Sequence, residues 1–393
     1  MTETERCAWV QLAFTPYIGA ESFAQLIEHC GSAEAALKAP ASLAAQLGRY
    51  GRQAAAVWHD TDKAKTACEA AFNWEKQPDC RLLLSCDDDF PMRLSEGLTP
   101  PPVLFVRGNA DLLRQASVGI VGSRHATPQA MRIAGDFGRA LSEQNITVIS
   151  GMAAGIDTAA HHGALQGAGS TIAVWGTGID RIYPQSNQKL AYQIAEQGAI
   201  VSEFPLGTRP LAGNFPRRNR LIAGLAQAVL VVEAALESGS LITARLAGEM
   251  GREVMAIPGS IDNPHSKGCH KLIKDGAKLV ECLDDILSEC PELLQKSIES
   301  SGSTQLPTKL STRKRANVSR ENKQPALVEI PSQAVAKVEE NSLLAMMGYD
   351  PIHPDLLAEK CKLATDEIYA QLTELELDGV VAAMPGGRFQ RIK

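Results

Sequence analysis

Short apolar runs alternate with amphipathic stretches through the middle of the chain, between about residues 116 and 290. The runs are rich in β-branched residues and too short for buried helices, so each predicts a strand. We expect these strands at Val118–Val121, Thr147–Ser150, Thr171–Val174, Ala199–Ser202, Val229–Val232 and Glu253–Ile257. The stretches between them predict helices at Pro128–Glu143, Asp157–Gln166, Gln188–Gln197 and Leu241–Met250. Because apolar strands that alternate with helices build a mainly parallel sheet covered on both faces, we predict an extended Rossmann-like α/β domain over residues 116–290.

The first 80 residues predict a separate helical domain, which is rich in Ala and holds three of the four tryptophans. The turn Tyr17–Ala20, followed by the amphipathic stretch Ser22–Ile27, suggests a SAM-like or helix-hairpin-helix-like element. The few basic residues of the segment favour the alternative, a plain turn of a helical bundle with Gly at the bend. Residues 81–115 predict a connector, since Pro91 and Pro100 to Pro102 exclude a long helix. Within it, Val103–Val106 predicts a short strand.

The pattern stops after residue 290. Residues 291–340 are polar, and Lys309 to Lys323 holds six basic residues against the single acid Glu321, so we predict a flexible basic linker. Residues 341–393 predict three helices, a hairpin and hence a winged-helix domain, at Ser342–Met347, Pro354–Cys361, Asp366–Leu377, Val380–Met384 and Arg388–Ile392. Its third helix is acidic and would be repelled by phosphates, which favours a protein-binding or regulatory role over DNA reading.

The charge and cysteine content narrow the choice of ligand and compartment. The formal net charge is −6, so a polyanion site has to come from a local basic cluster. The nine cysteines form no CxxC pair and no zinc-type spacing, so we expect free thiols in the cytoplasm and no metal site. The first ten residues lack an export signal, and no apolar run approaches the roughly 20 residues of a membrane helix.

The loops after the predicted strands carry residues suited to phosphate binding. In parallel sheets, ligands bind beyond the carboxyl ends of the strands. Gly122-Ser123-Arg124 follows the first strand and precedes a helix start at Thr127-Pro128, although a simple strand-to-helix turn would look the same. The second strand is followed by a small-residue loop with Gly151 and Asp157, which can cap the next helix. The adjacent His161 and His162 would point about 100° apart on a helix, which disfavours a metal pair.

Later loops supply further candidate contacts but no nucleotide-binding fingerprint. Gly176-x-Gly178 lacks the third glycine of the dinucleotide motif, and no phosphate-binding P-loop sequence occurs, so NAD and ATP are disfavoured and no cofactor is expected. Lys189, near the start of the following helix, could reach the same crevice. Beyond Glu233, the segment Glu237-Ser238-Gly239-Ser240 offers hydroxyl and N–H groups that suit a phosphate or a sugar.

The strongest basic cluster runs from Arg209 to Arg220 and contains no acid. An aromatic ring beside guanidinium groups is how single-stranded nucleic acid is held without base reading. A solvated basic helix face is the alternative. The candidate ligands in this cluster are Phe215, Arg217, Arg218, Asn219 and Arg220.

Taken in order, these loops resemble the DprA family, also called Smf, of DNA-processing proteins of natural transformation. The resemblance covers about 170 residues, and the helical front piece and winged-helix tail fit the same architecture. One departure is Gly268-Cys269-His270, where the family usually has a Gly-small-Asn step, which puts a polar contact from the Asn position in doubt. The matching segments are Val121–Arg124, Ser150–Asp157, Ala160-His161, Gly178–Asp180, Tyr183-Pro184, Ser202-Glu203, Phe215–Arg220, Glu233-Ala234, Ser238–Ala244, Ile257–Ser260 and Leu272–Ala277.

The resemblance implies a protein without catalytic residues that binds and protects single-stranded DNA and helps to load the RecA recombinase onto it. It also implies a homodimer formed through the Rossmann-like domain. By position, Gly122, Ser123 and Arg124 resemble the phosphate loop, Lys189 resembles a pocket lysine, and the Arg217–Arg220 segment lines the same mouth. Gly151, Asp157, Gly178, Ser238, Gly239 and Ser240 are further possible loop contacts.

Two other functions remain open on the residues alone. One is a nucleotide hydrolase similar to Rossmann-like phosphoribohydrolases, with Asp157, Glu203 or Glu233 as the catalytic carboxylate. That family's Pro-Gly-Gly-x-Gly-Thr loop is absent from the central domain. The other is a regulatory nucleotide sensor.

Overall fold

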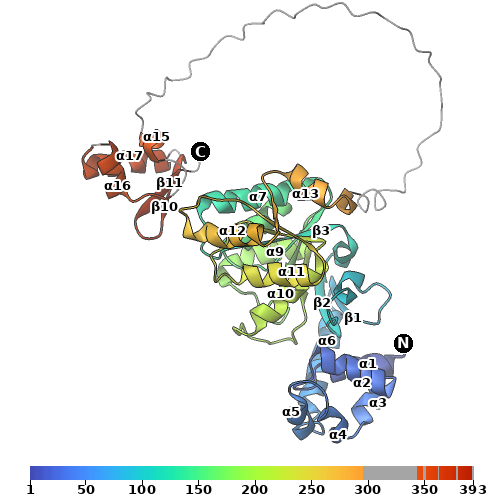
Figure 1. Ribbon diagram of the computed structural model, residues 1–393. Helices are drawn as coiled ribbons and strands as arrows, with labels where there is room; N and C mark the ends of the chain where they lie inside the picture. The colour runs from blue at the N-terminus through green and yellow to red at the C-terminus, as the bar shows by residue number, and fades with distance from the viewer. Residues whose placement is uncertain (295–342, 348–350, 362, 378, 392–393) are drawn as a thin grey trace, which may run out of the picture. The chain divides into compact units, whose positions relative to one another are not determined.

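The computed structural model describes residues 1–294, 343–347, 351–361, 363–377 and 379–391. The chain divides into two compact units, Met1–Ser300 and Ser301–Lys393 (Figure 1). Most of the predicted basic linker, including Lys309 to Lys323, lies outside the described residues, as do Ser342 and Ile392 of the predicted winged helix.

A nine-stranded sheet forms the centre of the first unit, in the order β1-β2-β6-β5-β4-β3-β7-β8-β9. Strands β3 to β9 pair in parallel, as the apolar pattern predicted, whereas β1 and β2 are antiparallel. The bounds are β1 (Cys80–Leu84), β2 (Val103–Gly108), β3 (Ser117–Val121), β4 (Thr147–Ser150), β5 (Thr171–Val174), β6 (Ala199–Ser202), β7 (Ala228–Val231), β8 (Glu253–Ala256) and β9 (Lys278–Leu279).

The segment predicted as a connector supplies two of these strands. The predicted strand at Val103–Val106 is confirmed as β2, which pairs with β6 through Phe105 opposite Ser202. Strand β1 pairs with β2 as its antiparallel neighbour and ends in three buried leucines, Leu82 to Leu84. The segment therefore extends the sheet.

Helices cover both faces of the sheet (Figure 1). The predicted helices α7 and α9 have the expected bounds, and α8 and α11 lie within two residues of theirs. Thr127 begins α7 as predicted, because its hydroxyl accepts the Ala130 N–H at 3.2 Å. The bounds are α7 (Pro128–Glu143), α8 (Ile156–Ala164), α9 (Gln188–Gln197), α10 (Asn214–Leu225), α11 (Ser240–Glu249), α12 (Lys267–Lys274) and α13 (Leu283–Glu289), with short 3-10 turns η1 (Met92–Ser95), η2 (Ala110–Arg114), η3 (Gln185–Asn187) and η4 (Pro264–Ser266).

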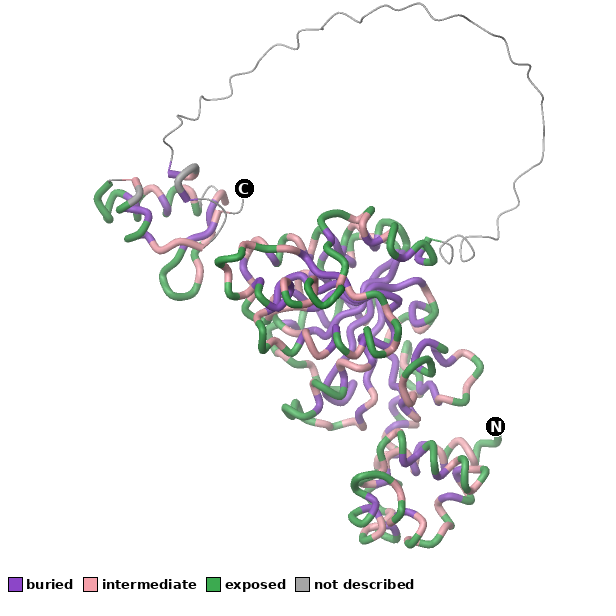
Figure 2. The backbone as a smooth tube through the Cα atoms, viewed as in Figure 1, coloured by how far each residue is buried: buried purple, intermediate pink, exposed green. Residues whose placement is uncertain are grey.

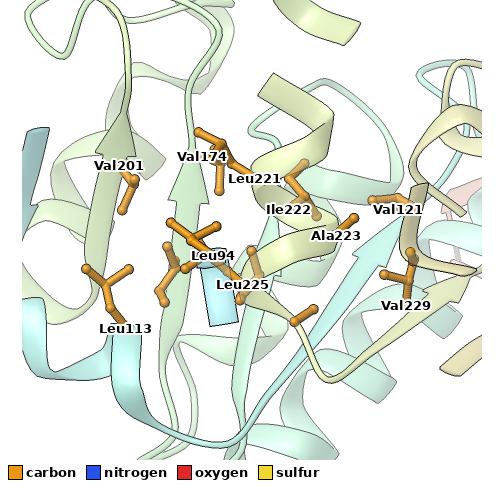
Figure 3. Close-up of a cluster of buried hydrophobic side chains, with 14 of the residues drawn as sticks. Leu94, Leu113, Val121, Val174, Val201, Leu221, Ile222, Ala223, Leu225 and Val229 are labelled. Atoms are coloured by element: carbon orange, nitrogen blue, oxygen red, sulfur yellow. The ribbon is translucent and has the colours of Figure 1, made fainter. Parts of the chain in front are cut away.

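The C-terminal half of α10 is packed into the core. Leu221, Ile222 and Leu225 point toward strand residues such as Val174 and Val229 (Figure 3). Strands β3 to β7 are buried along their whole length, whereas the outer sides of the helices and the edge strand β9 are exposed (Figure 2). The position of α10 is therefore fixed by burial of its apolar end against the sheet.

The N-terminal helices form a small core of their own, as predicted, and also pack against the sheet. The Phe105 ring of β2 stacks on Phe14 at 5.9 Å and meets Trp74 edge-on at 5.3 Å between centroids. Trp9 donates its indole N–H to the Pro102 carbonyl at 2.9 Å. The helices are α1 (Glu3–Ala13), α2 (Ala20–Cys30), α3 (Ala33–Lys38), α4 (Ala41–Ala44), α5 (Gly51–Ala56) and α6 (Asp62–Glu75).

The described part of the second unit has the predicted winged-helix order of three helices and a hairpin. Its core includes Leu357, Ile368 and Val381, all buried. The elements are α15 (Leu343–Met347), α16 (Pro354–Cys361), α17 (Thr365–Leu377), β10 (Val381–Met384) and β11 (Arg388–Arg391).

Helices α7 and α8 cross at a contact made by glycines. A Cβ at Gly163 would overlap the Gly135 carbonyl oxygen and lie 2.8 Å from the Gly135 carbonyl carbon. At Gly138 it would lie 2.5 Å from the Ala160 carbonyl oxygen. Backbone atoms cannot rotate away as a side chain can, so this crossing requires glycine. A Cβ at Gly135, by contrast, would meet only the Ala159 oxygen, at 3.6 Å.

We expect Gly163→Ala to lower the free energy of unfolding by about 2 kcal/mol or more, because it forces the two helices apart. The matched control Gly135→Ala should be neutral or stabilising by up to about 1 kcal/mol, since alanine has the higher helix propensity. Urea unfolding followed by circular dichroism measures both. Equal midpoints for the two variants would show that the crossing is looser than the structure indicates.

Candidate nucleic-acid interface

A cavity of about 510 Å³ lies at the carboxyl ends of the parallel strands. The chain leaves β3 toward β4, β5 and β6 on one side and returns to β7 and β8 on the other, so the strand order reverses between β3 and β7. Open α/β sheets bind their ligands at such a switch point. The cavity is lined by the loops after β3, β4 and β7 and by α10, and the lining includes Gly122, Ser123, Arg124, Asp157, Phe215, Arg218, Asn219, Ser238, Gly239 and Ser240.

The loop after β3 is held rigidly by its backbone. Ser123 N–H donates to the Glu233 carbonyl oxygen at 2.7 Å, and the Ser123 hydroxyl accepts the His125 N–H at 3.1 Å. A Cβ at Gly122 would lie 2.6 Å from the Ile156 side chain and 2.9 Å from the Glu233 oxygen, so only glycine fits. The predicted loop Gly122-Ser123-Arg124 therefore presents Arg124 at a fixed place on the cavity wall.

Arg124 and Phe215 form a stacked pair at the mouth. The Arg124 guanidinium lies 5.4 Å from the Phe215 ring centroid, and Phe215 lies 5.7 Å from the ring of Tyr183. Arg124 is exposed, and Tyr183 is 47% exposed, so both present free faces. The three side chains also line a smaller adjoining cavity of about 100 Å³. An aromatic ring beside a free guanidinium suits a stacked base next to a phosphate.

Arg218 lies beneath this mouth and is 4% exposed. Its Nη1 donates to the carbonyl oxygens of Gly151 and Val174, which mark the ends of β4 and β5. Burial lowers the pKa of Arg218, Asp157 raises it and the positive Arg124 lowers it, and together they bring it to about 10. The guanidinium therefore stays charged at neutral pH and contributes positive potential to the cavity floor.

Asp157 is buried beside it. One of its carboxylate oxygens, Oδ2, accepts the N–H groups of Gly151 and Ala153 at 3.1 and 3.2 Å. Burial raises the pKa of Asp157, and the attraction of Arg218 opposes that shift. Asp157 thus orders the loop after β4 and offsets part of the cost of burying Arg218.

The predicted basic cluster separates on folding into two faces of α10. Phe215, Arg218 and Asn219 line the cavity, whereas Arg217 and Arg220 do not. Arg217 lies 5.1 Å from the Phe204 ring centroid. Residues three and four apart share a helix face, so the sequence spacing alone could have divided this cluster.

Arg220 is committed to the fold. Its guanidinium pairs with the Glu203 carboxylate and donates to the Thr99 carbonyl at 3.1 Å. The Glu203 side chain is only 5% exposed in this pair. We expected Arg220 to line the same mouth as Arg124, but Arg220 is not part of that cavity's lining.

Two other predicted residues lie away from the cavity lining. Lys189 is exposed in the first turn of α9. Gly178 packs near the Pro205 carbonyl, where a Cβ would lie 2.7 Å from that oxygen. On the opposite wall, Asn219 donates to the Gly239 carbonyl at 3.4 Å, and the Ser238 and Ser240 hydroxyls lie 2.7 Å apart.

Some lining residues were absent from the predicted site. His125 directly follows the predicted phosphate loop, and His265 enters from the η4 turn, far along the chain. Tyr183 was noted only as part of a motif, although its ring extends the Arg124–Phe215 stack. At the unusual Gly268-Cys269-His270 step, the His270 ring Nε2 lies 2.9 Å from the Gly259 carbonyl oxygen, so this position does make a polar contact.

The central part of the chain matches a known protein family. A family model described as DNA recombination-mediator protein A matches residues 81–291. The chain is 41% identical over 331 residues to protein Smf of Escherichia coli strain K12, which covers 82% of this chain and 80% of that protein. The chain belongs to the DprA/Smf family. Models described as a DprA-like N-terminal HHH domain and a DprA winged helix domain match residues 3–61 and 329–387. The first of these favours the helix-hairpin-helix-like interpretation of the turn at Tyr17–Ala20.

Further DprA relatives cover mainly the central domain. The chain is 47% identical over 216 residues to DNA processing protein DprA of Streptococcus pneumoniae, which is 55% of this chain and 75% of that protein. The X-ray structure of that species' DprA has a TM-score of 0.61 and 36% identity, and covers 74% of this chain and 98% of that structure. This DprA/Smf chain therefore shares its fold with a solved family member.

Two further findings on the described residues concern metal sites and membrane-spanning helices. No group of three or more His, Cys, Asp or Glu side chains among them is arranged to hold a metal ion. In the part of the chain that the structure describes, no helix has the length and apolar character needed to cross a membrane.

His161, which the predictions treated with His162, is buried between α8 and the sheet. Its Nδ1 lies 2.7 Å from the Thr171 hydroxyl, which itself donates to the Val148 carbonyl. The Thr171 proton is thus already used, so Nδ1 is the donor. The buried Nε2 has no hydrogen-bond partner, so a second ring proton there would be unsatisfied. Burial, with the nearby His162 and Arg218, lowers the pKa of His161 from 6.5 to about 3.

Because the unfolded chain protonates His161 near pH 6.5 and the folded chain does not until about pH 3, folding loses stability as the pH falls through that window. The loss is about 1.4 kcal/mol per pH unit well below pH 6.5. We expect His161→Asn to be less stable at about pH 7, and its deficit to shrink by more than 1 kcal/mol at about pH 5. The exposed neighbour variant His162→Asn should follow the parent chain. Urea unfolding at both pH values measures this, and a constant deficit would contradict the assignment.

Proposed function

We propose that this DprA/Smf chain binds and protects single-stranded DNA and loads a RecA-type recombinase onto it. The observation that carries the proposal is the Arg124–Phe215 stack above a cavity whose floor holds the buried Arg218 charge. Stacking beside a fixed cation tolerates any base, which is what a sequence-independent strand binder requires. The charge is local, as the net charge of −6 demands.

Two features favour a polymer over a free nucleotide. The Arg124–Phe215 stack is continued outward by the exposed Tyr183 ring, so more than one base has a partner. The loops also lack the dinucleotide fingerprint that would close around a pyrophosphate. A strand that enters at the mouth can therefore extend beyond it.

The carboxylates considered for a hydrolase are already engaged. Glu233 accepts hydrogen bonds from the Thr127 hydroxyl at 2.8 Å and the Thr127 N–H at 3.2 Å. Burial raises the pKa of Glu233, and these two hydrogen bonds partly offset that rise. Asp157 is held by two N–H groups, and Glu203 pairs with Arg220. A general base has to reach a substrate proton, so these commitments favour binding over acid–base catalysis.

The remaining parts of the proposal concern partners and place. We infer a homodimer formed through the Rossmann-like domain, a RecA-type partner and a cytoplasmic location. A pull-down of RecA by the full chain, with and without single-stranded DNA, tests the partner. Comparison with a chain truncated at residue 290 asks whether the winged-helix domain takes part. Failure of RecA to bind under either condition would remove recombinase loading but leave strand binding standing.

We expect Arg124→Ala and Phe215→Ala each to weaken oligo-dT binding by about tenfold, because each removes a stacking or phosphate contact. Arg124→Ala should also reduce the slope of log affinity against log salt by about one, since one phosphate contact is lost. Arg114→Ala is the matched control, because Arg114 lies just before β3 at the opposite edge of the sheet. Fluorescence anisotropy with labelled oligonucleotide measures all three.

Other results would direct the proposal elsewhere. Unchanged binding by a folded Arg124→Ala variant would remove this cavity from the interface. Turnover of a nucleoside monophosphate by the parent chain would support the hydrolase instead. Tight binding of a mononucleotide without binding of oligo-dT would support a nucleotide sensor.

A further inference from the structure

A second cavity, of about 850 Å³, opens on the other side of α10. Two turns of the N-terminal helices line it, Tyr17–Ser22 and Gly48–Tyr50, together with the segment Gly97–Thr99. Arg217 and Arg220 of α10 and the end of α11 complete the wall. Among the residues that the structure describes, its lining and that of the first cavity have no member in common.

Helix α10 is thus a shared wall between the two cavities. Phe215, Arg218 and Asn219 face the first, whereas Arg217 and Arg220 face the second. A helix is about 10 Å across with its side chains, so a chain that leaves one cavity reaches the other by crossing a single helix.

The second cavity repeats the chemistry of the first. Tyr17 and Tyr50 are 54% and 49% exposed, and their ring centroids lie 6.5 Å apart. The Arg49 guanidinium lies 5.6 Å from the Tyr50 ring centroid. Because about half of each tyrosine is exposed, the two rings offer free faces to bases beside a guanidinium.

The charge along this groove comes from two arginines. In the described part of the chain, Arg49 and Arg217 make no ion pair with an acid, whereas Arg220 is neutralised by Glu203. Glu21 and Glu249 also line the groove, and Glu249 pairs with Arg245 at 3.6 Å. The positive charge of the groove therefore lies at Arg49, beside Tyr50, and at Arg217 on α10, while Glu21 adds one acid to the wall.

We propose that this groove, defined by Tyr17, Arg49, Tyr50 and Arg217, is a second binding site for single-stranded nucleic acid, reached by the strand that leaves the first cavity over α10. The inference rests on the proposed function and names where the strand continues. Free ring faces favour a single strand over a duplex, whose bases are already stacked. They also favour a nucleic acid over an acidic peptide, which would need cations but no stacking rings.

The test uses the full chain and the double variant Tyr17→Ala/Tyr50→Ala. We expect its affinity for a long oligo-dT of about 40 nucleotides to fall by about tenfold, because one stacked contact is lost. Its affinity for a short oligo-dT of about 6 nucleotides, which fills only the first cavity, should change by less than about twofold. Tyr192→Ala is the matched control, because Tyr192 is a 54% exposed tyrosine of α9 that lines neither cavity.

Each result has one reading. An equal loss for short and long oligonucleotides, or no loss for either, overturns the groove while leaving the first site intact. If an acidic peptide competes for the groove as strongly as oligo-dT, the proposed nucleic-acid site is also overturned. If the parent chain binds neither oligonucleotide, the proposed function itself fails.

A second measurement avoids dependence on a variant that fails to fold. Single strands carrying 5-iodouracil at successive positions are bound to the unaltered chain and irradiated. We expect cross-links to Tyr17 or Tyr50 only from positions beyond those that cross-link to Phe215 or Tyr183. Cross-links confined to Phe215 and Tyr183 at every position would overturn the proposal.

Discussion

The Arg218 guanidinium lies at the carboxyl ends of β4 and β5, where its Nη1 donates to the Gly151 and Val174 carbonyls. These carbonyls belong to two neighbouring parallel strands, so one side chain joins α10 to the edge of the sheet where ligands bind. Burial of a charge is costly unless it is hydrogen-bonded and compensated, and Asp157 provides the compensation. A Cβ at Gly151 would lie 2.6 Å from the guanidinium carbon, so glycine at this position is what allows Arg218 to take this place. The ends of β4 and β5 and helix α10, which lie far apart in sequence, are therefore held together by this one guanidinium.

The rest of the candidate site follows from how this contact orients α10. With Arg218 facing the sheet edge and Leu221 and Ile222 in the core, Phe215 has to emerge beside Arg124, and Arg217 has to emerge on the other side. The stack at the mouth is thus set by helix periodicity. The loop after β3 meets it because Gly122 allows close approach to Glu233 and Ile156.

The sheet was predictable wherever burial alone decides the structure. Strands β4, β5 and β6 are apolar, fully buried and short, and their predicted bounds agree with the structure. The bounds of helix α10 were not predicted, because most of its apolar residues lie in its last turns and Pro216 stands in its first. Strand β1 was missed because its buried apolar run is only three residues long, Leu82 to Leu84, and lies at the boundary between two predicted segments. His265 reaches the cavity through tertiary packing that no local spacing records.

The same reasoning explains how an acidic chain can hold a polyanion. A uniform positive surface is excluded by the net charge of −6, so the cations have to be placed singly and kept from neighbouring acids. The fold does this by placing Arg124 on a rigid loop, burying Arg218 beneath it, and pairing Arg220 with Glu203. Of Arg124 and the three arginines of α10, only Arg124 and Arg217 are then left for a ligand, on opposite sides of the helix. With one such cation at each cavity, the proposed binding relies on the aromatic rings beside them, in the pairs Phe215–Tyr183 and Tyr17–Tyr50.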